Sequence, residues 1–535
     1  MIQAPEPRNE PVLSYAPGSP EREALRAEVE AYQSESLPLW IGGEAIRTDQ
    51  QQTFSSPHAH QRKLGAASLA GEPELAKALD AARQAKGAWA SLSQSDRASV
   101  FLRAAELLSG PWRQKVNAAT LLGQSKTPHQ AEIDSACELI DFLRFNAHYA
   151  DKLAEDQPSS SAGIWNRLEQ RPLDGFVYAI TPFNFTAIAG NLPSAPALMG
   201  NTVIWKPSPN AMLAAQRVME LFNEAGLPPG VINLVNGDPV AITSRVLAAP
   251  DFAGLHYTGS TSVFQSLWAQ IANNLPKYRS YPRIVGETGG KDFIFAHPSA
   301  DVRQLAVAIV RGGYEFQGQK CSAASRVYVP RSLWPELKKI LEETIAQIQV
   351  GDPADFSNFM GAVISAQAFE KISGYQELGK ADPKVRCVAG GGGNRDVGYF
   401  VDPTLFEVED PKHRLMQEEI FGPVVTLWVY DDARLEEALD LVDSTSGYAL
   451  TGAVFARDRQ AIVSAASRLR FAAGNFYVND KPTGAVVGQQ PFGGSRLSGT
   501  NDKAGSAQNL ARWVSPRTVK ETLSPPVDWR YPYMS

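Results

Sequence analysis

Short apolar strands that alternate with helical segments are the feature that most restricts how this chain can fold. Residues 176–180 form a continuous apolar run of strand length, and residues 202–205 form a second. Runs of the same kind occupy 231–235 and 255–257, and helical patterns occupy 211–225 and 241–247. Such runs, separated by helices, indicate a parallel sheet with crossover helices, because both faces of that sheet are covered. The sequence therefore predicts an α/β fold.

Polar side chains stand at the ends of three of these runs. Asn184 follows the first run, Lys206 closes the second and Ser260 follows the last. In an open α/β sheet, ligands bind beyond the carboxyl ends of the strands. These three residues are therefore candidates for one binding site at that edge of the sheet.

A nucleotide signature is weak in this part of the chain. The Gly-x-Gly-x-x-Gly fingerprint and the Walker lysine loop are both absent. Residues 258–264 lie between a strand and a helix, and backbone amides at such a helix N-terminus can hold a pyrophosphate. An ordinary helix cap by Ser260 or Thr261 explains the same segment equally well, so both interpretations stay open.

A candidate reactive cysteine lies in the loop 315–322. Cys321 follows Gly318 and Lys320 in a run between two apolar segments. A thiol reacts as a thiolate, so a catalytic cysteine needs partial exposure and positive potential nearby. The alternative is a small buried hydrophobe, which is how most free cysteines behave. The flanking segments predict a second α/β unit: a helix start or strand at 307–313, a strand at 324–329 and a helix at 333–349.

A candidate general base stands upstream of the cysteine. Glu287 lies close behind an apolar pair and precedes the diglycine Gly289-Gly290. Apolar walls disfavour a charged carboxylate, which tunes it toward base catalysis near neutral pH. An exposed loop glutamate is the alternative. Glu138 poses a similar choice, because charged groups in an apolar helix such as 133–149 usually face solvent or form a structural pair.

Length and composition exclude several classes of function. The 535 residues are too many for one core, and roughly two to four domains are expected. A net charge of −6 gives no electrostatic case for nucleic acid or an anionic membrane. The three cysteines form no disulfide framework and no CxxC metal pattern, and no leader or membrane-spanning run is visible. We expect a soluble protein without metal, in a reducing compartment: the cytoplasm for a bacterial-type chain, or the mitochondrial matrix for a processed eukaryotic one.

Along nearly its whole length the chain resembles the aldehyde dehydrogenase superfamily, whose motifs occur here in the family's order and at family-like distances. The resemblance rests on Thr181-Pro182-Phe183-Asn184-Phe185, Trp205-Lys206-Pro207, Thr258-Gly259-Ser260-Thr261, Glu287-Thr288-Gly289-Gly290-Lys291, Gly318-Gln319-Lys320-Cys321, Glu418-Glu419-Ile420-Phe421-Gly422-Pro423-Val424 and Pro491-Phe492-Gly493-Gly494-Ser495. Other stretches are typical of the branch that oxidises L-glutamate γ-semialdehyde, the open form of 1-pyrroline-5-carboxylate: Asn9-Glu10-Pro11-Val12-Leu13, Gly18-Ser19-Pro20-Glu21-Arg22, Phe142-Leu143-Arg144-Phe145-Asn146 and Ser498-Gly499-Thr500-Asn501-Asp502-Lys503.

The resemblance implies catalytic roles for three residues already singled out. Cys321 would attack the aldehyde carbon, and its own N–H and the Asn184 amide would hold the developing oxyanion. Hydride transfer to NAD would leave a thioester, and Glu287 would activate the water that hydrolyses it. The implied reaction is oxidation of L-glutamate γ-semialdehyde to L-glutamate, the second step of proline degradation. Lys320 receives no direct chemical role.

A cofactor site follows from the same resemblance. The residues implied for NAD are Phe183, Lys206, Pro209, Gly259, Ser260, Glu419 and Phe421. Pro209 stands where many members have an acidic residue, and Phe264 where many have glycine. The first departure weakens the choice of NAD over NADP, since an acid there would repel a 2′-phosphate. NAD is expected because the branch prefers it.

The resemblance also implies a substrate site and a division of the chain. The substrate residues are Glu138, Phe185, Ser322, Gly505 and Ser506, with the turn at Gly505-Ser506 offering backbone amides to the α-carboxylate. The implied parts are a Rossmann-like NAD-binding domain (1–150 and 174–286), an α/β catalytic domain (287–509) and a small β oligomerisation flap (151–173 and 510–535). A homodimer, or a larger homo-oligomer built from dimers, is therefore expected.

Two other functions are weighed against this reading. One is a binding or structural protein that keeps the scaffold and has lost the chemistry. The joint presence of nucleophile, base and oxyanion amide argues against it. The other is an NAD(P)-dependent dehydrogenase of another semialdehyde, such as succinate semialdehyde.

Overall fold

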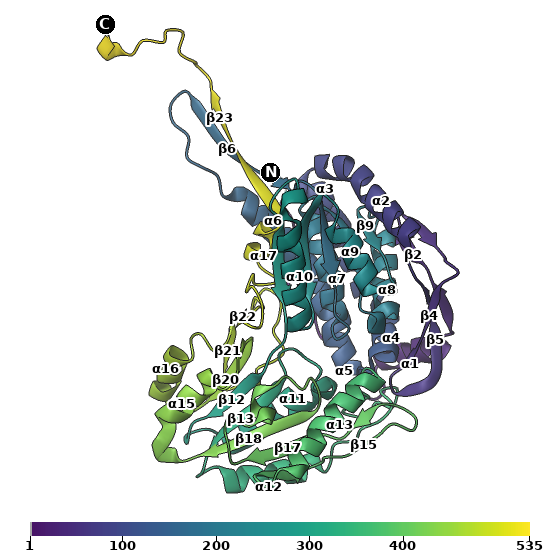
Figure 1. Cartoon of the computed structure of the whole chain (residues 1–535), viewed down its shortest axis with the longest axis vertical. Helices are drawn as coiled ribbons and strands as arrows, with labels where there is room; N and C mark the ends of the chain where they lie inside the picture. The colour runs from purple at the N-terminus through teal and green to yellow at the C-terminus, as the bar shows by residue number, and fades with distance from the viewer. Residues whose placement is uncertain (1–2, 535) are drawn as a thin grey trace.

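Two seven-stranded sheets form the centres of two lobes in the computed structural model, which describes residues 3–534 (Figure 1). The first sheet has the order β11-β10-β7-β8-β9-β2-β3. Its members are β7 (Phe176–Ile180), β8 (Thr202–Lys206), β9 (Ile232–Leu234), β10 (Phe252–Thr258), β11 (Arg283–Glu287), β2 (Leu39–Ile41) and β3 (Glu44–Ile46). The five strands β7 to β11 run parallel, and β2 and β3 add an antiparallel edge. The predicted α/β fold is confirmed.

Helices cover this sheet because its strands are apolar on both faces. They are α2 (Glu72–Ser91), α3 (Gln94–Ser109), α7 (Thr186–Leu198), α8 (Met212–Glu224), α9 (Pro239–Leu247) and α10 (Thr261–Asn274). Strand order reverses between β7 and β10, which lie side by side although two strands separate them in the chain. Such a reversal opens a crevice at the carboxyl ends of the strands. Asn184 follows β7 there, and Ser260 follows β10.

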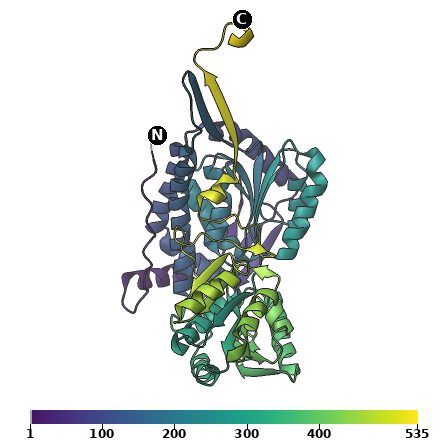
Figure 2. The same ribbon diagram turned by 90° about the vertical axis from the view of Figure 1, so that its left-hand side faces the viewer.

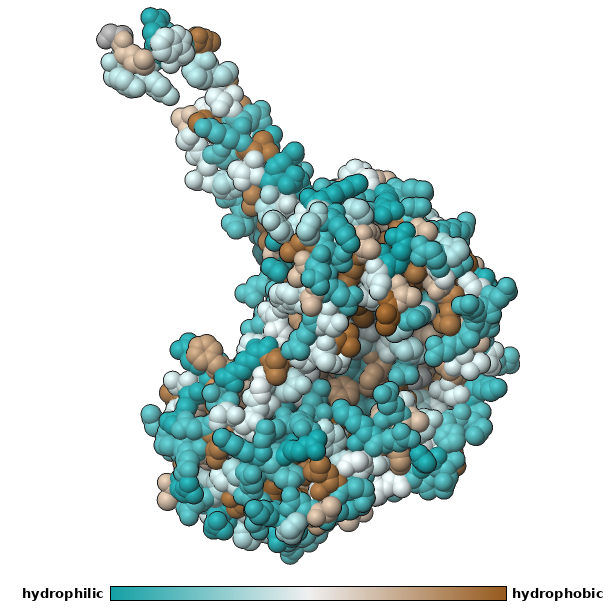
Figure 3. All heavy atoms as spheres, in the orientation of Figure 1, coloured by the Kyte–Doolittle hydropathy of each residue, from teal (hydrophilic) through white to brown (hydrophobic). Residues whose placement is uncertain are grey.

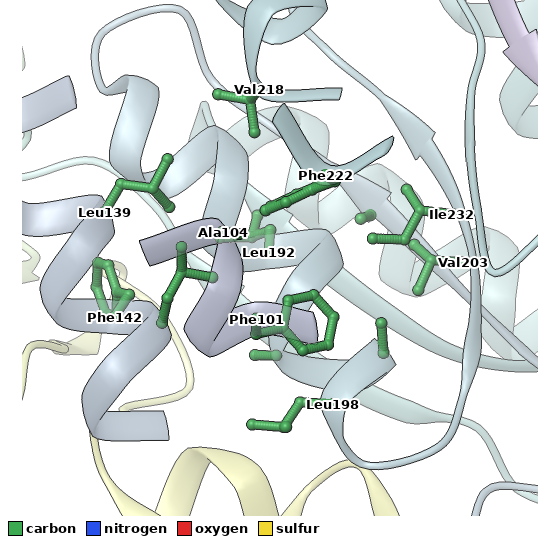
Figure 4. Close-up of a cluster of buried hydrophobic side chains, with 14 of the residues drawn as sticks. Phe101, Ala104, Leu139, Phe142, Leu192, Leu198, Val203, Val218, Phe222 and Ile232 are labelled. Carbon is green, nitrogen blue, oxygen red and sulfur yellow. The ribbon is translucent and has the colours of Figure 1, made fainter. Parts of the chain in front are cut away.

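The largest buried cluster joins these helices to the sheet (Figure 4). Phe101 of α3 and Phe222 of α8 pack edge to face, with ring centroids 5.9 Å apart. Small side chains let α7 approach the sheet, and every residue of that helix is buried despite the internal Pro193 and Pro196. Proline inside a helix removes a backbone hydrogen bond, so the sequence alone does not mark this segment as a helix.

The second sheet has the order β14-β17-β18-β13-β12-β20-β21, all parallel except β14. Its strands are β12 (Asp292–Ala296), β13 (Ala324–Pro330), β14 (Val385–Ala389), β17 (Thr404–Val408), β18 (Val424–Tyr430), β20 (Thr451–Phe455) and β21 (Asn475–Val478). Its helices include α11 (Val302–Tyr314), α12 (Trp334–Ile345), α13 (Ala366–Ala381), α15 (Leu435–Ser444) and α16 (Arg459–Arg468). The residues at 307–313 are therefore helical, which settles the helix-or-strand choice at that point.

A long helical segment beside the first lobe contains a π-helix. The chain passes from α5 (Pro128–Ala131) through η1 (Glu132–Glu138), which has π geometry, into α6 (Leu139–Glu155). The sequence indicated one helix at 133–149. π-Helices are rare and frequently occur at functional sites, and Glu138 is the last residue of this one.

A two-stranded ribbon projects from the first lobe (Figure 1). It pairs β6 (Ile164–Pro172) with β23 (Val514–Thr522), and the chain then continues outward. Large aromatic side chains lie exposed on the ribbon and tail, including Trp165, Trp529 and Tyr531. Figure 3 shows hydrophobic side chains scattered among hydrophilic ones along this projection. These segments fall within the expected oligomerisation flap, while the division of the chain into domains stays a prediction.

The remaining elements complete the two lobes. They are α1 (Pro20–Ala31), β1 (Glu35–Leu37), β4 (Gln51–Ser56), β5 (Ala59–Ser68), α4 (Arg113–Gln124), η2 (Pro209–Ala211), η3 (Leu275–Lys277), η4 (Glu315–Gly318), β15 (Gly393–Asn394), β16 (Phe400–Val401), α14 (Arg414–Gln417), η5 (Asp432–Arg434), β19 (Tyr448–Ala449), β22 (Ser495–Arg496), α17 (Ala507–Ala511) and η6 (Pro532–Met534). Within residues 3–534, no helix is long and apolar enough to cross a membrane.

Candidate active site

The loop that carries Cys321 has an unusual backbone. After α11 the chain enters η4, where Phe316 and Gln317 have φ values of 49° and 54°, and Gly318 follows with 63°. Left-handed backbone costs roughly 1–3 kcal/mol at each non-glycine residue and persists only where the surroundings enforce it. Consecutive residues of this kind turn the chain sharply just before the cysteine.

Side chains of the loop itself enforce this conformation. Gln317 is buried, and its Nε2 donates to the carbonyl oxygens of Ser125 at 3.1 Å and Ala362 at 2.7 Å. Gln319 is also buried, and its Oε1 accepts from the N–H of Ile364 at 2.9 Å. The loop is therefore anchored to both lobes through buried hydrogen bonds, which are costly to leave unmade.

Cys321 is half-buried in this loop, which gives the partial exposure that a reactive cysteine needs. Burial raises its pKa well above the usual value, and the charge of Glu287 adds to the rise. Lys320 is buried and pairs with Glu315 at 3.2 Å, so a carboxylate already neutralises its charge. That pairing agrees with the expectation that Lys320 has no direct chemical role. Of the other two cysteines, Cys137 is buried, which suits a structural thiol, and Cys387 is exposed.

Asn184 reaches the nucleophile loop from the other lobe. Its side chain is buried, and Nδ2 donates to the carbonyl oxygen of Gln319 at 3.1 Å. This bond fixes the amide two residues from Cys321 in the chain. The amide has two N–H groups, so one can serve the loop and the other a developing oxyanion.

Glu287 is the last residue of β11, and its charge contributes to the raised pKa of Cys321. Burial raises its pKa to about 8, with Lys503 lowering the value and Asp502 raising it. Three residues further on, the chain crosses directly over the nucleophile loop, because a Cβ at Gly290 would overlap the carbonyl oxygen of Cys321. The structure therefore brings the predicted base and nucleophile together. A pKa close to neutrality suits a general base.

Glu138 faces the same region. Burial raises its pKa well above the usual value, and Asp134, Asp141 and Glu287 raise it further. Glu138 also contributes to the raised pKa of Cys321. Among residues 3–534 Glu138 has no ion-pair partner, which argues against the structural pair considered from the sequence. Its side chain is half-buried, so a substrate-facing role stays a prediction.

Lys126 is a residue of this site that the sequence did not indicate. Its ammonium is fully buried, 2.6 Å from Asp134 and over the rings of Phe185 at 4.3 Å and Phe316 at 4.4 Å. Asp134 also accepts from the N–H groups of Thr186 and Ala187 at the start of α7. Only the preceding polar stretch marks Lys126 in the sequence, and its two ring partners come from distant segments.

A second group of predicted residues lies at the carboxyl ends of the first sheet. Lys206 is buried with its Nζ on the Pro207 carbonyl at 3.2 Å, and burial lowers its pKa to about 8. Ser260 begins α10 without a side-chain cap, and Thr261 donates its hydroxyl to Leu497 instead. The capping alternative therefore fails, and the first turn of α10 keeps uncapped amides beside Gly259.

Of the other residues predicted to bind the cofactor, Phe183, Glu419 and Phe421 lie near the nucleophile loop, and Pro209 lies apart from them. Phe183 and Phe421 pack edge to face at 5.9 Å, and Phe421 has a left-handed φ of 59°. The buried carboxylate of Glu419 accepts from the N–H of Gly290 at 2.9 Å, next to the nucleophile loop. Pro209 is exposed in η2, so the position at which many family members have an acidic residue carries no negative charge here.

Phe264, the second departure from the family pattern, has a matching partner. Its ring fills the space that a Cβ at Gly286 would occupy, directly before Glu287. It also stacks on Tyr257 with centroids 5.5 Å apart. The large side chain is therefore accommodated by a glycine on the neighbouring strand.

Three of the predicted substrate residues, Ser322, Gly505 and Ser506, have well-defined local contacts. Ser322 is buried, with its hydroxyl 2.8 Å from that of Thr483. Gly505 has a φ of 73°, which only glycine adopts readily, and Ser506 donates its hydroxyl to the carbonyl of Lys503 at 2.6 Å. A side chain at Gly505 would meet Val487 at 3.1 Å, so this turn is tightly backed.

The site geometry is that of a nucleophile, base and oxyanion donor beside a crevice of an α/β sheet. The aldehyde dehydrogenase family model matches residues 46–519, and the chain belongs to that family. The chain is 50% identical to the mitochondrial delta-1-pyrroline-5-carboxylate dehydrogenase of Mus musculus, over 98% of this chain and 94% of that protein.

Solved structures agree with this placement. The NAD-bound delta-pyrroline-5-carboxylate dehydrogenase of Mycobacterium tuberculosis matches with a TM-score of 0.97 and 53% identity, covering 100% of this chain and 99% of that one. The 1-pyrroline-5-carboxylate dehydrogenase from Thermus with bound NAD matches with a TM-score of 0.91 and 33% identity, covering 97% and 100%. The family resemblance and fold expected from the sequence are confirmed.

Proposed function

We propose that this protein oxidises L-glutamate γ-semialdehyde to L-glutamate with NAD as the hydride acceptor. The observation that carries the proposal is the convergence of Cys321, Glu287 and Asn184 at one partly exposed site in an aldehyde dehydrogenase. Relatives named for pyrroline-5-carboxylate oxidation, half identical over nearly the whole chain, support the substrate. A scaffold that had lost its chemistry would not need all three groups.

The first chemical step is attack of the Cys321 sulfur on the aldehyde carbon. The thiol proton passes to water as the carbon–sulfur bond forms, and the electron pair of the carbonyl double bond moves to the oxygen, which gains negative charge. The backbone N–H of Cys321 and the second N–H of Asn184 stabilise that charge, which is commonly the largest electrostatic contribution to catalysis. The product of this step is a thiohemiacetal.

The residues at the sheet crevice fit a dinucleotide. Lys206 and Glu419 offer a buried ammonium and a buried carboxylate for ribose hydroxyls, and the uncapped α10 amides suit a pyrophosphate. Gly259 and Ser260 lie at that helix start, Pro209 lies toward the adenosine end, and Phe183 and Phe421 border the nicotinamide end. NAD, when bound, supplies the acceptor for the hydride of the thiohemiacetal carbon.

Loss of that hydride leaves a thioester on Cys321. Glu287 then takes a proton from water, the hydroxide attacks the thioester carbon, and the carbon–sulfur bond breaks to release the carboxylic acid. Burial holds the pKa of Glu287 at about 8, which makes its carboxylate a stronger base than an exposed one.

The remaining contacts select a substrate that carries an α-amino acid group. A carboxyl with a raised pKa ionises when a cation is placed beside it, so Glu138 suits the α-ammonium. The backbone amides of the Gly505-Ser506 turn and the Ser322 hydroxyl suit the α-carboxylate. Phe185, supported by Lys126, packs on the methylenes.

The exposed ribbon and tail support a homodimer or a larger assembly of dimers. Aromatic side chains such as Trp529 and Tyr533 lie exposed there, and burial against a second copy would stabilise them. Three free cysteines fit a reducing compartment, which is the cytoplasm or the mitochondrial matrix.

The deciding experiment compares two aldehydes and two cofactors. We expect NAD reduction with pyrroline-5-carboxylate to be about tenfold or more as efficient as with succinate semialdehyde, because polar groups left unpaired penalise the wrong substrate. The assay is kcat/KM from NADH formation, repeated with NADP. Comparable values for the two aldehydes would contradict the substrate assignment, and faster turnover with NADP would contradict the cofactor assignment.

A further inference from the structure

The N-terminal arm, residues 3–19, lies along the helices of the first lobe before α1 begins (Figure 2). The middle of this arm makes specific polar contacts rather than resting loosely on the surface. Asn9 is the central residue. Its Nδ2 donates to Asp141 Oδ2 at 2.8 Å and to the Val487 carbonyl at 2.7 Å. Gln489 returns a bond of 3.0 Å to Asn9 Oδ1.

Asn9 thereby joins the two elements that carry opposite ends of the proposed substrate site. Asp141 lies one helical turn after Glu138, which faces the site from the end of the π-helix. Val487 backs Gly505, at which a Cβ would meet its Cγ1 at 3.1 Å. The two elements also pack directly against each other, because a Cβ at Gly505 would meet Phe142 of α6 at 3.4 Å and one at Gly488 would overlap the ring of Phe145. Asn9 adds hydrogen bonds to this apolar contact, and hydrogen bonds restrict the relative position of the two elements more narrowly than packing alone.

The arm also holds the π-helix at its two ends. Asp141 accepts a second bond from the N–H of Glu10 at 2.7 Å. At the other end Glu132 accepts from the N–H of Leu13 at 2.9 Å and from the Tyr15 hydroxyl at 2.8 Å. A π-helix is a locally strained register, and external bonds at both ends restrict where its last residue can lie.

We propose that residues 9–15 of the arm determine substrate specificity by fixing the separation between Glu138 and the Gly505-Ser506 turn. This inference rests on the proposed function, since it concerns the recognition of a substrate with both an ammonium and a carboxylate. The arm contacts neither group of the substrate. It is a positioning element, and its effect falls on aldehydes that need both anchors.

The test uses Asn9→Ala in the full-length protein, assayed with pyrroline-5-carboxylate and with propanal, which has neither anchor group. We expect kcat/KM for pyrroline-5-carboxylate to fall about tenfold, mainly through KM, because small misplacements of binding groups are costly. The value for propanal should stay within about twofold of wild type. Gln3→Ala is the matched control, because Gln3 lies on the same arm and donates only to Glu155 at 2.7 Å.

An unchanged ratio of the two kcat/KM values in Asn9→Ala would overturn the inference, whether both values stay at the wild-type level or both fall by the same factor. If Asn9→Ala does not fold, Tyr15→Phe replaces it, because this substitution removes the hydroxyl hydrogen bond to Glu132. The ratio of kcat/KM for pyrroline-5-carboxylate to kcat/KM for propanal then tests the inference in the same way. The proposed function fails separately, if the wild-type protein shows no preference for pyrroline-5-carboxylate. A wild-type preference that Asn9→Ala retains refutes only the role of the arm.

Discussion

The pH dependence of turnover gives the most direct test of Glu287 as the base. Burial raises the pKa of Glu287 to about 8 in the folded protein. A base must be ionised to accept a proton, so thioester hydrolysis should accelerate as pH rises through that value. About a tenth of the Glu287 groups are ionised at pH 7 and about nine-tenths at pH 9 for a pKa near 8. Where hydrolysis limits turnover, kcat should therefore rise about tenfold across this range.

Two neighbouring charges allow the sign of this effect to be checked. Lys503 lowers the pKa of Glu287, and Asp502 raises it. Asp502→Asn should therefore move the midpoint of the profile to lower pH, and Lys503→Met should move it to higher pH. Glu287→Gln should remove the rise and slow steady turnover by roughly 10²–10⁴-fold, as is usual when a general base is lost.

The assay is stopped-flow NADH formation with an aldehyde that does not cyclise, since ring closure of the natural substrate also changes with pH. Glu287→Gln should still give a burst of about one NADH per site, because acylation of Cys321 precedes the step that it impairs. A wild-type profile that is flat from pH 7 to 9, or a variant without a burst, would refute this assignment. Shifts of the same sign in both neighbouring variants would refute the electrostatic explanation.

Three other substitutions separate chemistry, geometry and cofactor binding. Cys321→Ala should abolish turnover while NAD still binds, measured by calorimetry, and turnover near wild type would remove Cys321 from the mechanism. Lys126→Met should cost roughly 3–5 kcal/mol of stability by leaving the Asp134 carboxylate buried without its cation, and should lower kcat by loosening the nucleophile loop. Thermal unfolding and burst kinetics measure the two effects, and unchanged values for both would contradict the role. Lys206→Met should weaken NAD about tenfold or more yet raise the melting temperature without NAD, since the lowered pKa of Lys206 means that its buried charge opposes folding at pH values below about 8. Equal losses of affinity and stability would refute this reading.

The sequence alone was sufficient to predict those features of the fold and the site that depend on a single segment of the chain. The strand at 176–180 has the bounds expected from its apolar run, because a continuous apolar segment needs cover on both faces. Cys321 and Glu287 stand in stretches whose neighbours suit their chemistry, and the family resemblance connected them. The raised pKa of Glu287 has the direction expected from its apolar neighbours in the sequence, and its main cause is burial in the folded protein.

Long-range partners explain what the sequence did not indicate. Lys126 acquires a role only because Asp134, Phe185 and Phe316 converge on it. The proline-rich arm reads as a surface segment, and the bonds of Asn9 to residues 132 and 478 positions away leave no mark in its own sequence. The π register of η1 is likewise invisible, because the hydrogen-bond shift depends on what the surrounding structure holds in place.

The nucleophile loop shows why the site belongs to the contact between the lobes rather than to either lobe alone. Cys321 stands on the second lobe, but its left-handed backbone is held by the Gln317 bond to Ser125 and by the Asn184 bond to Gln319, both of which cross to the first lobe. Strained backbone relaxes when its restraints are removed. Separation of the lobes would therefore release the loop and at the same time withdraw the oxyanion amide. A substitution in the first lobe that weakens this contact should lower kcat even though the substituted residue does not touch the substrate. The value of kcat therefore depends on the contact between the two lobes.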